Sequence, residues 1–379
     1  MKIAIVTETF LPSTDGIVTR LTKAIDYMLE EEHEVIIIAP DVGDMPGDYR
    51  GAPIYPMPSK TFFFYKHRPW GVPSTKVGKL FRSFEPDIVH VVSPFSLGVA
   101  GVHYAKKYEI PLICSFHTNI PHYLSHYGFG AFKPIVWKYI VKLHNEAKIN
   151  LVTSQAMYDL LDEQGVQGLD ILPKGVDVDN RHPSFYSESM RERLSEGEVD
   201  KKLLIFVGRL APEKNIASLQ RILSERKDLR LAVIGDGPSK KDLEETFEGL
   251  PVVFTGFLHG EELSQAYASA DAFVFPSRLE TLGLVITEAM ASGTPVLAIY
   301  SEPTAEQITH LENGLMFDGE DLPSLDEAVD LIDDRGLMAE VSENARDYAE
   351  QFSWDHASAA MVEAYEETLV LNGVYEYHY

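Results

Sequence analysis

The feature that most constrains the fold is a series of short apolar segments that alternate with longer amphipathic ones. The segments between the apolar runs, such as residues 18–30, have the apolar spacing of a helix. Short apolar strands that alternate with helices are typical of a parallel sheet covered on both faces. In the first half of the chain the apolar runs are KIAIVTE (2–8), EVIIIAP (34–40), DIVHVVS (87–93), PLICSFH (111–117), INLVTSQ (149–155) and DILPKGV (170–176).

The same pattern restarts after a polar stretch near residues 180–202, with LLIFVGR, RLAVIGDG, VVFTGF, AFVFPS and PVLAIY as its apolar runs. We therefore expect two α/β domains, at residues 1–180 and 181–352, which suits a length of 379 residues. Residues 353–379 are predicted to form C-terminal helices, with packing back onto the first domain as one option. Ligands of parallel sheets bind beyond the carboxyl ends of the strands, so the expected site is a cleft between the domains.

Cysteine content and hydropathy favour an intracellular protein. Cys114 is the single cysteine, so no internal disulfide can form. The first apolar run stops at Thr7, too early for a signal peptide. No apolar segment reaches the roughly 18–20 residues of a membrane-spanning helix. The expected location is cytoplasmic, either free or peripheral on the cytoplasmic face of a membrane.

The formal net charge of −25 lies mostly in the second half of the chain. Residues 1–180 hold 17 Lys and Arg against 20 Asp and Glu, whereas residues 181–379 hold 16 against 38. Such an acidic protein repels phosphate backbones, which argues against nucleic acid as its main partner.

Two windows of the first half, residues 59–84 and 110–145, contain no acidic residue. Both mix basic with aromatic side chains, as elements that lie on an anionic membrane do. The alternative is an ordinary core helix with a solvated lysine face. The candidate membrane or acceptor residues are Phe63, Phe64, Lys66, Arg68 and Trp70 in the first window, and Lys133, Trp137, Lys138 and Lys142 in the second.

Cations follow the apolar run LLIFVGR. Gly208 and Arg209 end this run, and Lys214 comes shortly after. Arg offers a planar fork and Lys a mobile point charge, a combination that suits a diphosphate. The alternative is an ion pair between Arg209 and a neighbour such as Glu213.

Carboxylates surround the predicted start of a helix in SRLETLGLVITEAMASG, where Glu280 and Glu288 lie eight positions apart. Thr281, Leu282 and Gly283 are expected at the helix start, where unpaired backbone N–H groups bind phosphate. Glu288 lies too far into the helix to cap it. Its carboxylate is suited to accept two ribose hydroxyls, with a salt bridge on a solvated face as the alternative.

Other loops after strands carry further candidates. Gly16 precedes a helix, where it either lets backbone amides approach an anion or eases the chain into the helix. His117 directly follows a strand, and its neutral ring is suited to hydrogen-bond a sugar or phosphate, with a structural role as the alternative. Asp236 lies in a glycine-rich turn, and the backbone beside Phe257 and Leu258 is expected to be exposed and to offer a platform for a base.

No metal site is expected. His122 and His126 have i,i+4 spacing but no evident third ligand. Asp177 and Asp179 form a D-x-D sequence, but it falls in a strand-end turn near the linker.

Taken in order, the motifs FVGRLAPEKN, VIGDGP, TGFLHGEELSQAYASADAFVFPS and the E-x7-E stretch with EAMASGTPV resemble those of the family 4 glycosyltransferases. The resemblance covers nearly the whole chain. In the first half, ETFLPSTDGI, FEPDIVHVVSPFSLG, SFHTNIPHYL and LPKGVDVDNRHP resemble enzymes that place a sugar on diacylglycerol, such as sulfoquinovosyl-, glucosyl- and mannosyl-diacylglycerol synthases, and the related phosphatidylinositol mannosyltransferases. The resemblance implies an α/β architecture of the GT-B type, with two Rossmann-like, doubly wound parallel-sheet domains that face each other across a cleft.

The resemblance also implies roles for individual residues. Arg209 and Lys214 would bind the donor diphosphate and stabilise it as it leaves, and Glu288 would bind the ribose. Glu280 and the backbone of residues 281–283 would hold the transferred sugar and the phosphate. Gly16 would contact the diphosphate from the other domain, and His117 would lie near the sugar on the acceptor side. The remaining donor-binding candidates are Gly208, Asp236 and Leu258.

The implied reaction is a retaining transfer of a hexose-type sugar from a nucleotide-diphosphate sugar, with uridine as the preferred base, to a lipid such as diacylglycerol. No metal or other cofactor is expected, since cations and a helix terminus would replace Mg²⁺. The alternatives are the same chemistry on a soluble acceptor, epimerisation of a nucleotide sugar, or nucleotide-sugar binding without catalysis. The segment YSEPTAEQI replaces the two glycines and glutamate that the family often has, which leaves the donor sugar open.

Overall fold

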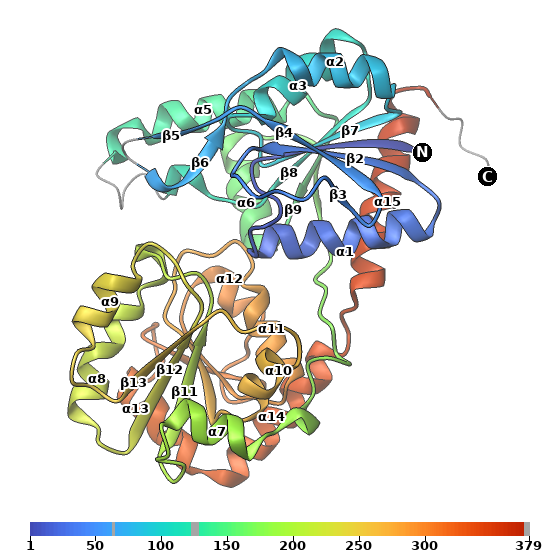
Figure 1. The fold of residues 1–379 in the computed structure, drawn as a ribbon. Coiled ribbons are helices and arrows are strands. Elements are labelled where there is room, and N and C mark those ends of the chain that lie inside the picture. Colours follow the sequence, from blue (N-terminus) through green and yellow to red (C-terminus); the bar gives the residue numbers. More distant parts are fainter. Residues whose placement is uncertain (63–64, 123–128, 375–379) are drawn as a thin grey trace. The chain divides into compact units, whose positions relative to one another are not determined.

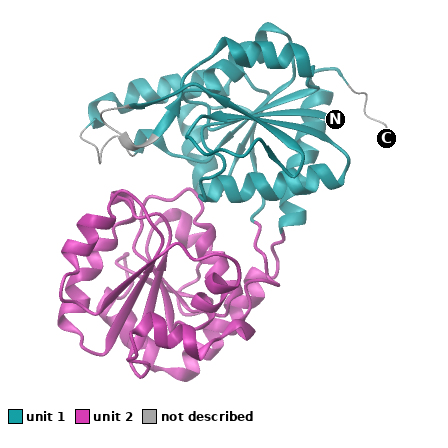
Figure 2. Cartoon of the chain, viewed as in Figure 1, with its two compact units in different colours: residues 1–174, 354–379 teal, residues 175–353 magenta. Residues whose placement is uncertain are grey.

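The structure is a computed structural model that describes residues 1–62, 65–122 and 129–374. The chain divides into two compact units (Figures 1 and 2). Unit 1 holds residues 1–174 and the segment from Trp354 onward, and unit 2 holds residues 175–353. The first boundary lies at Lys174–Gly175 rather than after residue 180, because Val176 already packs into the apolar core of unit 2.

Unit 1 is built on an eight-stranded sheet with the order β10-β9-β8-β7-β1-β2-β4-β3. Its neighbouring strands pair in parallel, except β3 with β4. A separate antiparallel hairpin joins β5 to β6. The strands are β1 (Lys2–Thr7), β2 (Glu34–Pro40), β3 (Asp48–Tyr49), β4 (Ala52–Met57), β5 (Ser59–Phe62), β6 (Tyr65–Gly71), β7 (Ile88–Val92), β8 (Leu112–Phe116), β9 (Ile149–Val152) and β10 (Leu169–Ile171).

Helices cover both faces of this sheet (Figure 1). Apolar residues of α1 and α15 pack on one face, and those of α2 and α3 pack on the other. The C-terminal helix α15 lies against α1, so the end of the chain completes the core of unit 1. The helices are α1 (Gly16–Glu30), α2 (Thr75–Phe84), α3 (Gly98–Lys107), η1 (Gly130–Phe132), α5 (Lys133–His144), α6 (Gln155–Gln164) and α15 (Trp354–Leu371).

Unit 2 is built on a six-stranded parallel sheet with the order β13-β12-β11-β14-β15-β16. One face carries α7, α10 and α11, and the other carries α8, α9 and α13. The strands are β11 (Lys202–Val207), β12 (Leu229–Ile234), β13 (Val252–Gly256), β14 (Ala272–Phe275), β15 (Val296–Ile299) and β16 (Leu315–Phe317). The helices are η2 (Pro183–Phe185), α7 (Glu188–Ser195), η3 (Pro212–Lys214), η4 (Ile216–Leu219), α8 (Gln220–Glu225), α9 (Lys240–Thr246), α10 (Gly260–Ala268), α11 (Leu284–Ala291), α12 (Glu302–Ala305), α13 (Leu325–Asp330), η5 (Leu331–Asp333) and α14 (Arg335–Ala349).

Every strand predicted from an apolar run is confirmed. Most of these strands are buried, whereas β10 and β13, at the edges of the two sheets, are partly exposed. The strands between Asp48 and Gly71 were not predicted. Prolines interrupt β4, and charged side chains interrupt the hairpin, so neither has a continuous apolar run.

Candidate active site

The strand order of unit 2 reverses between β11 and β14, which are neighbours in the sheet but far apart in sequence. In an open parallel sheet this switch point is where ligands bind, beyond the carboxyl ends of the strands. The loop after β11 holds Gly208, Arg209 and Lys214, and the loop after β14 leads through Glu280 to α11. The fold therefore brings the predicted cations and the first predicted carboxylate to one edge of one sheet.

These two loops are joined by polar contacts. The Lys214 ammonium forms an ion pair with the Glu280 carboxylate, which is 13% exposed. The side-chain amide of Asn215 donates to the Pro276 carbonyl over 3.3 Å, and the Ser277 hydroxyl donates to the Glu213 carbonyl over 3.2 Å. Lys214 is thus held at the switch point by a residue of the opposite loop.

Arg209 forms an ion pair with Glu213, four residues further on. The ion pair that was the alternative to diphosphate binding is therefore present. The Arg209 side chain is nevertheless more than one-third exposed, whereas the Glu213 side chain is almost fully buried. The pairing therefore holds Arg209 beside the switch point, with part of its side chain exposed to solvent.

Glycines allow the loop after β12 to touch the loop after β11. Gly235 has a φ of +138°, and a Cβ atom there would lie 1.9 Å from the Gly208 carbonyl oxygen. At Gly237 a Cβ atom would lie 2.4 Å from the Leu210 carbonyl oxygen. The Leu210 amide donates to the Asp236 carbonyl over 2.9 Å, which locks the two loops together. The glycines of VIGDGP thus shape the backbone around Arg209.

Asp236 and Leu258 lie on the neighbouring strand ends. The Asp236 carboxylate accepts from its neighbour's amide, Gly237 N, over 2.7 Å, and lies 3.2 Å from the Lys240 ammonium. The Leu258 side chain is buried in the apolar core. The expected platform is the backbone beside it, and that role stays a prediction. Phe257 is the exposed residue of this pair, and its ring stacks on His259.

Helix α11 begins at Leu284, so residues 281–282 precede it rather than open it. Gly283 is the N-cap, with a φ of +76° that favours glycine, and no side chain caps the helix among the described residues. The buried Gln307 fixes this turn from behind. Its side-chain amide donates to the Leu282 carbonyl and accepts from the Thr287 hydroxyl at 3.1 Å. The resulting helix start suits a phosphate.

Glu288 lies one turn into α11, beside two residues that sequence reasoning missed. The Tyr267 hydroxyl donates to its carboxylate over 3.1 Å, and Arg181 Nε lies 3.8 Å from the same oxygen. The Arg181 guanidinium also stacks over the Tyr267 ring at 5.7 Å. Burial raises the pKa of Glu288, and Arg181 and the Tyr267 hydroxyl offset part of that rise. The alternative of an ordinary salt bridge on a solvated face does not describe this environment.

In unit 1 the strand order reverses between β1 and β7. Near this switch point, backbone amides at the starts of α1 and α3 donate to carboxylates of the protein itself. Asp15 caps α1 by accepting from Ile17 N and Val18 N, each at 3.0 Å. Glu8 accepts from the amides of Ser96 and Gly98 at the start of α3. The amide of Gly16, the first residue of α1, does not donate to the Asp15 carboxylate.

His117 directly follows β8, as predicted. Its Nε2 lies 2.9 Å from the Ser115 hydroxyl, and its amide donates to the Ser93 hydroxyl over 3.2 Å. Burial holds the pKa of His117 well below its ordinary value, with additional lowering by Arg20, His90 and His144. The ring is therefore neutral at physiological pH.

Helix α5 carries a surface that mixes basic and apolar side chains. Phe132, just before the helix, is 55% exposed and Ile135 is 65% exposed. Lys138, Tyr139 and Lys142 are exposed at helical spacing from them, and Lys133 at the helix start is partly exposed. We call residues 132, 135, 138, 139 and 142 the α5 face.

Trp137 does not belong to the α5 face, and its assignment to a membrane surface was wrong. It is 6% exposed and its ring stacks on Phe116, because position 137 points to the core side of the helix. In the other window Trp70 is partly buried and packs on Phe95. Phe63 and Phe64 lie outside the described residues, as do the side chains of Lys66 and Arg68.

The D-x-D sequence forms a turn. The Asp177 carboxylate accepts from the backbone and side-chain amides of Asn180 at 3.1 and 2.8 Å. Within the described ranges no three His, Cys, Asp or Glu side chains gather as metal ligands would. His126 lies outside those ranges.

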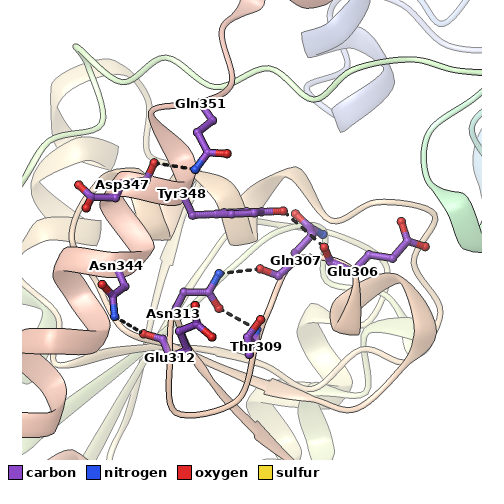
Figure 3. Close-up of a pocket in the computed structure, with 9 residues that line it drawn as sticks. All are labelled: Glu306, Gln307, Thr309, Glu312, Asn313, Asn344, Asp347, Tyr348 and Gln351. Atoms are coloured by element: carbon purple, nitrogen blue, oxygen red, sulfur yellow. Dashed lines mark hydrogen bonds between the residues drawn. The ribbon is translucent and has the colours of Figure 1, made fainter.

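A pocket of about 300 Å³ lies elsewhere in unit 2, between the loop that joins α12 to β16 and the C-terminal end of α14 (Figure 3). Its polar groups pair with one another. Asn313 donates to the Gln307 carbonyl, Asn344 to the Glu312 carbonyl, and Tyr348 to the Glu306 carbonyl. None of the predicted site residues lines this pocket.

None of the helices in the described ranges combines the length and the apolar character that crossing a bilayer requires.

Comparison with known proteins decides the family. The family described as Glycosyltransferase Family 4 matches residues 14–180, and the family described as Glycosyl transferases group 1 matches residues 190–348. The chain is also 36% identical over 351 residues to the sulfoquinovosyl transferase SQD2 of Arabidopsis thaliana. The aligned region covers 90% of this chain and 69% of that protein. The chain belongs to the family 4 glycosyltransferases.

Other relatives of this glycosyltransferase differ in the sugar that their names give. A GDP-mannose-dependent alpha-mannosyltransferase of Mycolicibacterium smegmatis is 35% identical over 323 residues, covering 84% of both chains. An alpha-monoglucosyldiacylglycerol synthase of Streptococcus pneumoniae is 30% identical over 314 residues, covering 79% of this chain and 71% of that one.

The solved structure of Anabaena HepE with UDP-glucose matches 97% of this glycosyltransferase and 100% of that chain, with a TM-score of 0.77 and 19% identity. The fold is thus the GT-B fold, with two Rossmann-like α/β units, and the predicted fold class and enzyme class are confirmed.

Proposed function

We propose that this family 4 glycosyltransferase moves a hexose-type sugar from a nucleotide-diphosphate sugar to a lipid acceptor such as diacylglycerol, with retention of the anomeric configuration. The observation that carries the donor half is the meeting of Arg209, Lys214 and Glu280 at the switch point of unit 2. Two cations lie there beside a helix start that no side chain caps within the described ranges, as a diphosphate requires.

The cations act on the leaving group. In the proposed reaction the bond between the sugar C1 and the diphosphate oxygen breaks, and the negative charge that develops on the diphosphate is met by Arg209 and Lys214. This preorganised positive charge takes the place that Mg²⁺ fills in other transferases, so we propose that no metal takes part. Glu280, held by Lys214, accepts hydrogen bonds from sugar hydroxyls, and Glu288 accepts from the ribose.

Retention follows from attack on the face that the diphosphate leaves. The acceptor hydroxyl oxygen bonds to C1 on that face, and its proton passes to an oxygen of the departing phosphate. The products are a glycoside and a nucleoside diphosphate, so atoms and charge balance without a protein nucleophile. His117 stays neutral and contacts the sugar on the acceptor side as a hydrogen-bonding group.

The α5 face supports a lipid acceptor. It exposes two large apolar side chains beside Lys138 and Lys142, in a stretch of 36 residues (110–145) without an acidic residue. Such a face suits the surface of an anionic membrane, which would place the enzyme peripherally on the cytoplasmic leaflet. The Streptococcus pneumoniae relative is named for a glucosyldiacylglycerol product, which agrees with this acceptor.

For the nucleotide we propose uridine, with guanosine as the second candidate. The fold neighbour solved with UDP-glucose supports uridine, whereas the GDP-mannose-dependent relatives support guanosine.

A matrix of donors and acceptors tests the proposal. UDP-glucose, UDP-galactose, UDP-sulfoquinovose and GDP-mannose are each offered with diacylglycerol in anionic vesicles, with phosphatidylinositol, and with soluble sugars and inositol phosphate. We expect one donor to give a chloroform-soluble product, with an α-linkage by NMR and without added metal. Transfer to soluble acceptors alone would overturn the lipid assignment, and loss of transfer in EDTA would overturn the metal-free assignment.

Arg209→Gln tests the diphosphate site, with Arg221→Gln as its matched control. Both arginines pair with a glutamate four residues on, but Arg221 lies on α8, away from the switch point. A charged hydrogen bond contributes about 1.5–3 kcal/mol, so R209Q should weaken nucleotide binding roughly 10- to 100-fold and R221Q should not. Equal affinity of R209Q and the wild type in calorimetry would show that the diphosphate binds elsewhere.

A further inference from the structure

A chain of buried polar side chains leads from the C-terminal helix to His117. The Tyr365 hydroxyl on α15 lies 2.8 Å from His90 Nδ1, and His90 Nε2 on β7 lies 2.8 Å from the Ser115 hydroxyl. Ser115, on β8, lies in turn 2.9 Å from His117 Nε2. Tyr365, His90 and Ser115 are fully buried, so their polar atoms depend on one another for hydrogen bonds.

Counting the hydrogens fixes the direction of the first bond. The Tyr365 hydroxyl carries one hydrogen, and among the described residues His90 Nδ1 is the one acceptor within reach. Leaving this hydrogen unpaired in the core would be unfavourable, so Tyr365 donates and Nδ1 accepts. Burial lowers the pKa of His90 to about 3, so the ring is neutral and carries a single N–H. That hydrogen is therefore on Nε2.

The remaining bonds follow from the first. His90 Nε2–H donates to the Ser115 oxygen, which leaves the Ser115 hydrogen to be donated to His117 Nε2. A neutral His117 that accepts at Nε2 carries its hydrogen on Nδ1. The distances alone fit either direction of donation along this series of hydrogen bonds. The buried hydroxyl of Tyr365, at one end of the series, decides the direction.

We propose that Tyr365, His90 and Ser115 are positioning residues that hold His117 in the Nδ1–H tautomer, so that its ring presents a hydrogen-bond donor. The inference rests on the proposed function, in which His117 contacts the sugar. With Nε2 engaged by Ser115, His117 donates to a sugar oxygen and does not remove the acceptor's proton. The proton transfer is then left to the departing phosphate.

Ring-nitrogen NMR on ¹⁵N-histidine-labelled protein measures the tautomers without any substrate. We expect His117 with its hydrogen on Nδ1 and His90 with its hydrogen on Nε2. Tyr365→Phe keeps the ring in the core but removes the donor, so both histidines should then populate both tautomers. The matched control is Thr368→Val, which removes a buried hydroxyl from the same helix that bonds only to the Ala364 carbonyl, at 2.8 Å, among the described residues. It should leave both tautomers unchanged.

Kinetics separate positioning from a merely structural role. Tyr365→Phe and Ser115→Ala should each lower kcat about tenfold, the worth of roughly one hydrogen bond. Nucleotide affinity should stay at the wild-type value. Because both break one chain, the double variant should be no slower than the slower single variant. The conservative variant Ser115→Thr retains the bridging hydroxyl and should therefore retain most of the activity.

Several results would overturn the inference. His117 found with its hydrogen on Nε2 in the wild type would do so, as would unchanged tautomers in Y365F, or losses in kcat that add in the double variant. If Y365F does not fold, the tautomers of S115A decide the question. If no donor and acceptor pair reacts, the proposed function fails, while the NMR result still decides whether the chain fixes the tautomer.

Discussion

Glu288 differs from a surface glutamate in that burial raises its pKa. A carboxyl whose pKa is higher in the folded than in the unfolded state contributes stability that is complete below the unfolded pKa and is lost as the pH rises through the folded pKa. Glu288→Gln, which resembles the neutral carboxyl, should therefore raise Tm at pH 7 and have little effect at pH 4. The same change should weaken nucleotide binding about tenfold or more, because a charged acceptor of ribose hydroxyls is lost.

Thermal scans and calorimetry at the two pH values check both effects. Glu245→Gln is the control, since that carboxylate is exposed and pairs only loosely with Lys241. A fall in Tm at pH 7 would mean that pairing with Arg181 and Tyr267 outweighs the cost of burial.

Gly235 tests whether the glycine-rich turn is needed for packing. Gly235→Ala would place a Cβ atom 1.9 Å from the Gly208 carbonyl oxygen, so the loop that carries Arg209 must move. Strain and overpacking together should cost about 2–5 kcal/mol of unfolding free energy. Gly249→Ala is the matched control, because its φ is +76° but nothing lies within 4 Å of the added atom. It should cost about 1–2 kcal/mol.

Urea unfolding of both variants gives this comparison, and nucleotide titration of G235A adds a second one. Equal costs at the two glycines would show that the loops separate easily. The donor site would then not depend on their contact.

At the scale of elements, the α5 face can be tested apart from the active site. Lys138→Gln with Lys142→Gln should weaken binding to anionic vesicles roughly 30-fold, since each lysine near such a surface contributes about 1 kcal/mol. The control pair is Lys227→Gln with Lys241→Gln, two exposed lysines of unit 2. Vesicle sedimentation measures the affinity. Equal losses of vesicle affinity in the two double variants would mean that the positions of the lysines do not matter. The α5 face would then not be a membrane-binding surface.

The elements show where sequence reasoning works and where it stops. Strands such as β1 and β11 are predictable because continuous apolar runs have no other place than a buried sheet. The strand ends then locate Arg209, Glu280 and His117. Trp137 was misplaced because a helix turns about 100° per residue, so its neighbours Lys138 and Tyr139 face solvent while it faces the core.

Residues brought in by tertiary contacts had no local signal. Arg181 and Tyr267 reach Glu288 from the linker and from α10, and Gln307 reaches the Leu282 carbonyl from the loop after α12. The segment YSEPTAEQI, which differs from the usual family sequence, drew attention to that loop. The sequence did not indicate the contacts that Gln307 makes. Tyr365 is a similar case, because only the packing of α15 on unit 1 brings it to His90.

At the scale of the whole molecule, charge is divided between the two halves of the chain. Residues 181–379, which contain nearly all of unit 2, carry 16 basic against 38 acidic residues, while residues 1–180 are close to balance. The proposed donor is an anion that must approach the acidic half. The proposed membrane face is a cationic patch in the balanced half, and its target is an anionic surface. The net acidic charge of residues 181–379 therefore opposes the approach of the donor. The lysines of the α5 face favour the approach of the membrane.

These two encounters should respond to salt in opposite directions. The screening length falls from about 30 Å at 0.01 M salt to about 10 Å at 0.1 M. Added salt removes long-range repulsion of the nucleotide, while Lys214, which is mostly buried, keeps its contact. We expect the nucleotide association rate constant, from stopped-flow fluorescence, to rise severalfold over this range. Vesicle affinity in the same samples should fall. If both weaken together, the field at the nucleotide's entrance is set by Arg209 and Lys214, and the acidic remainder of unit 2 has no part in it.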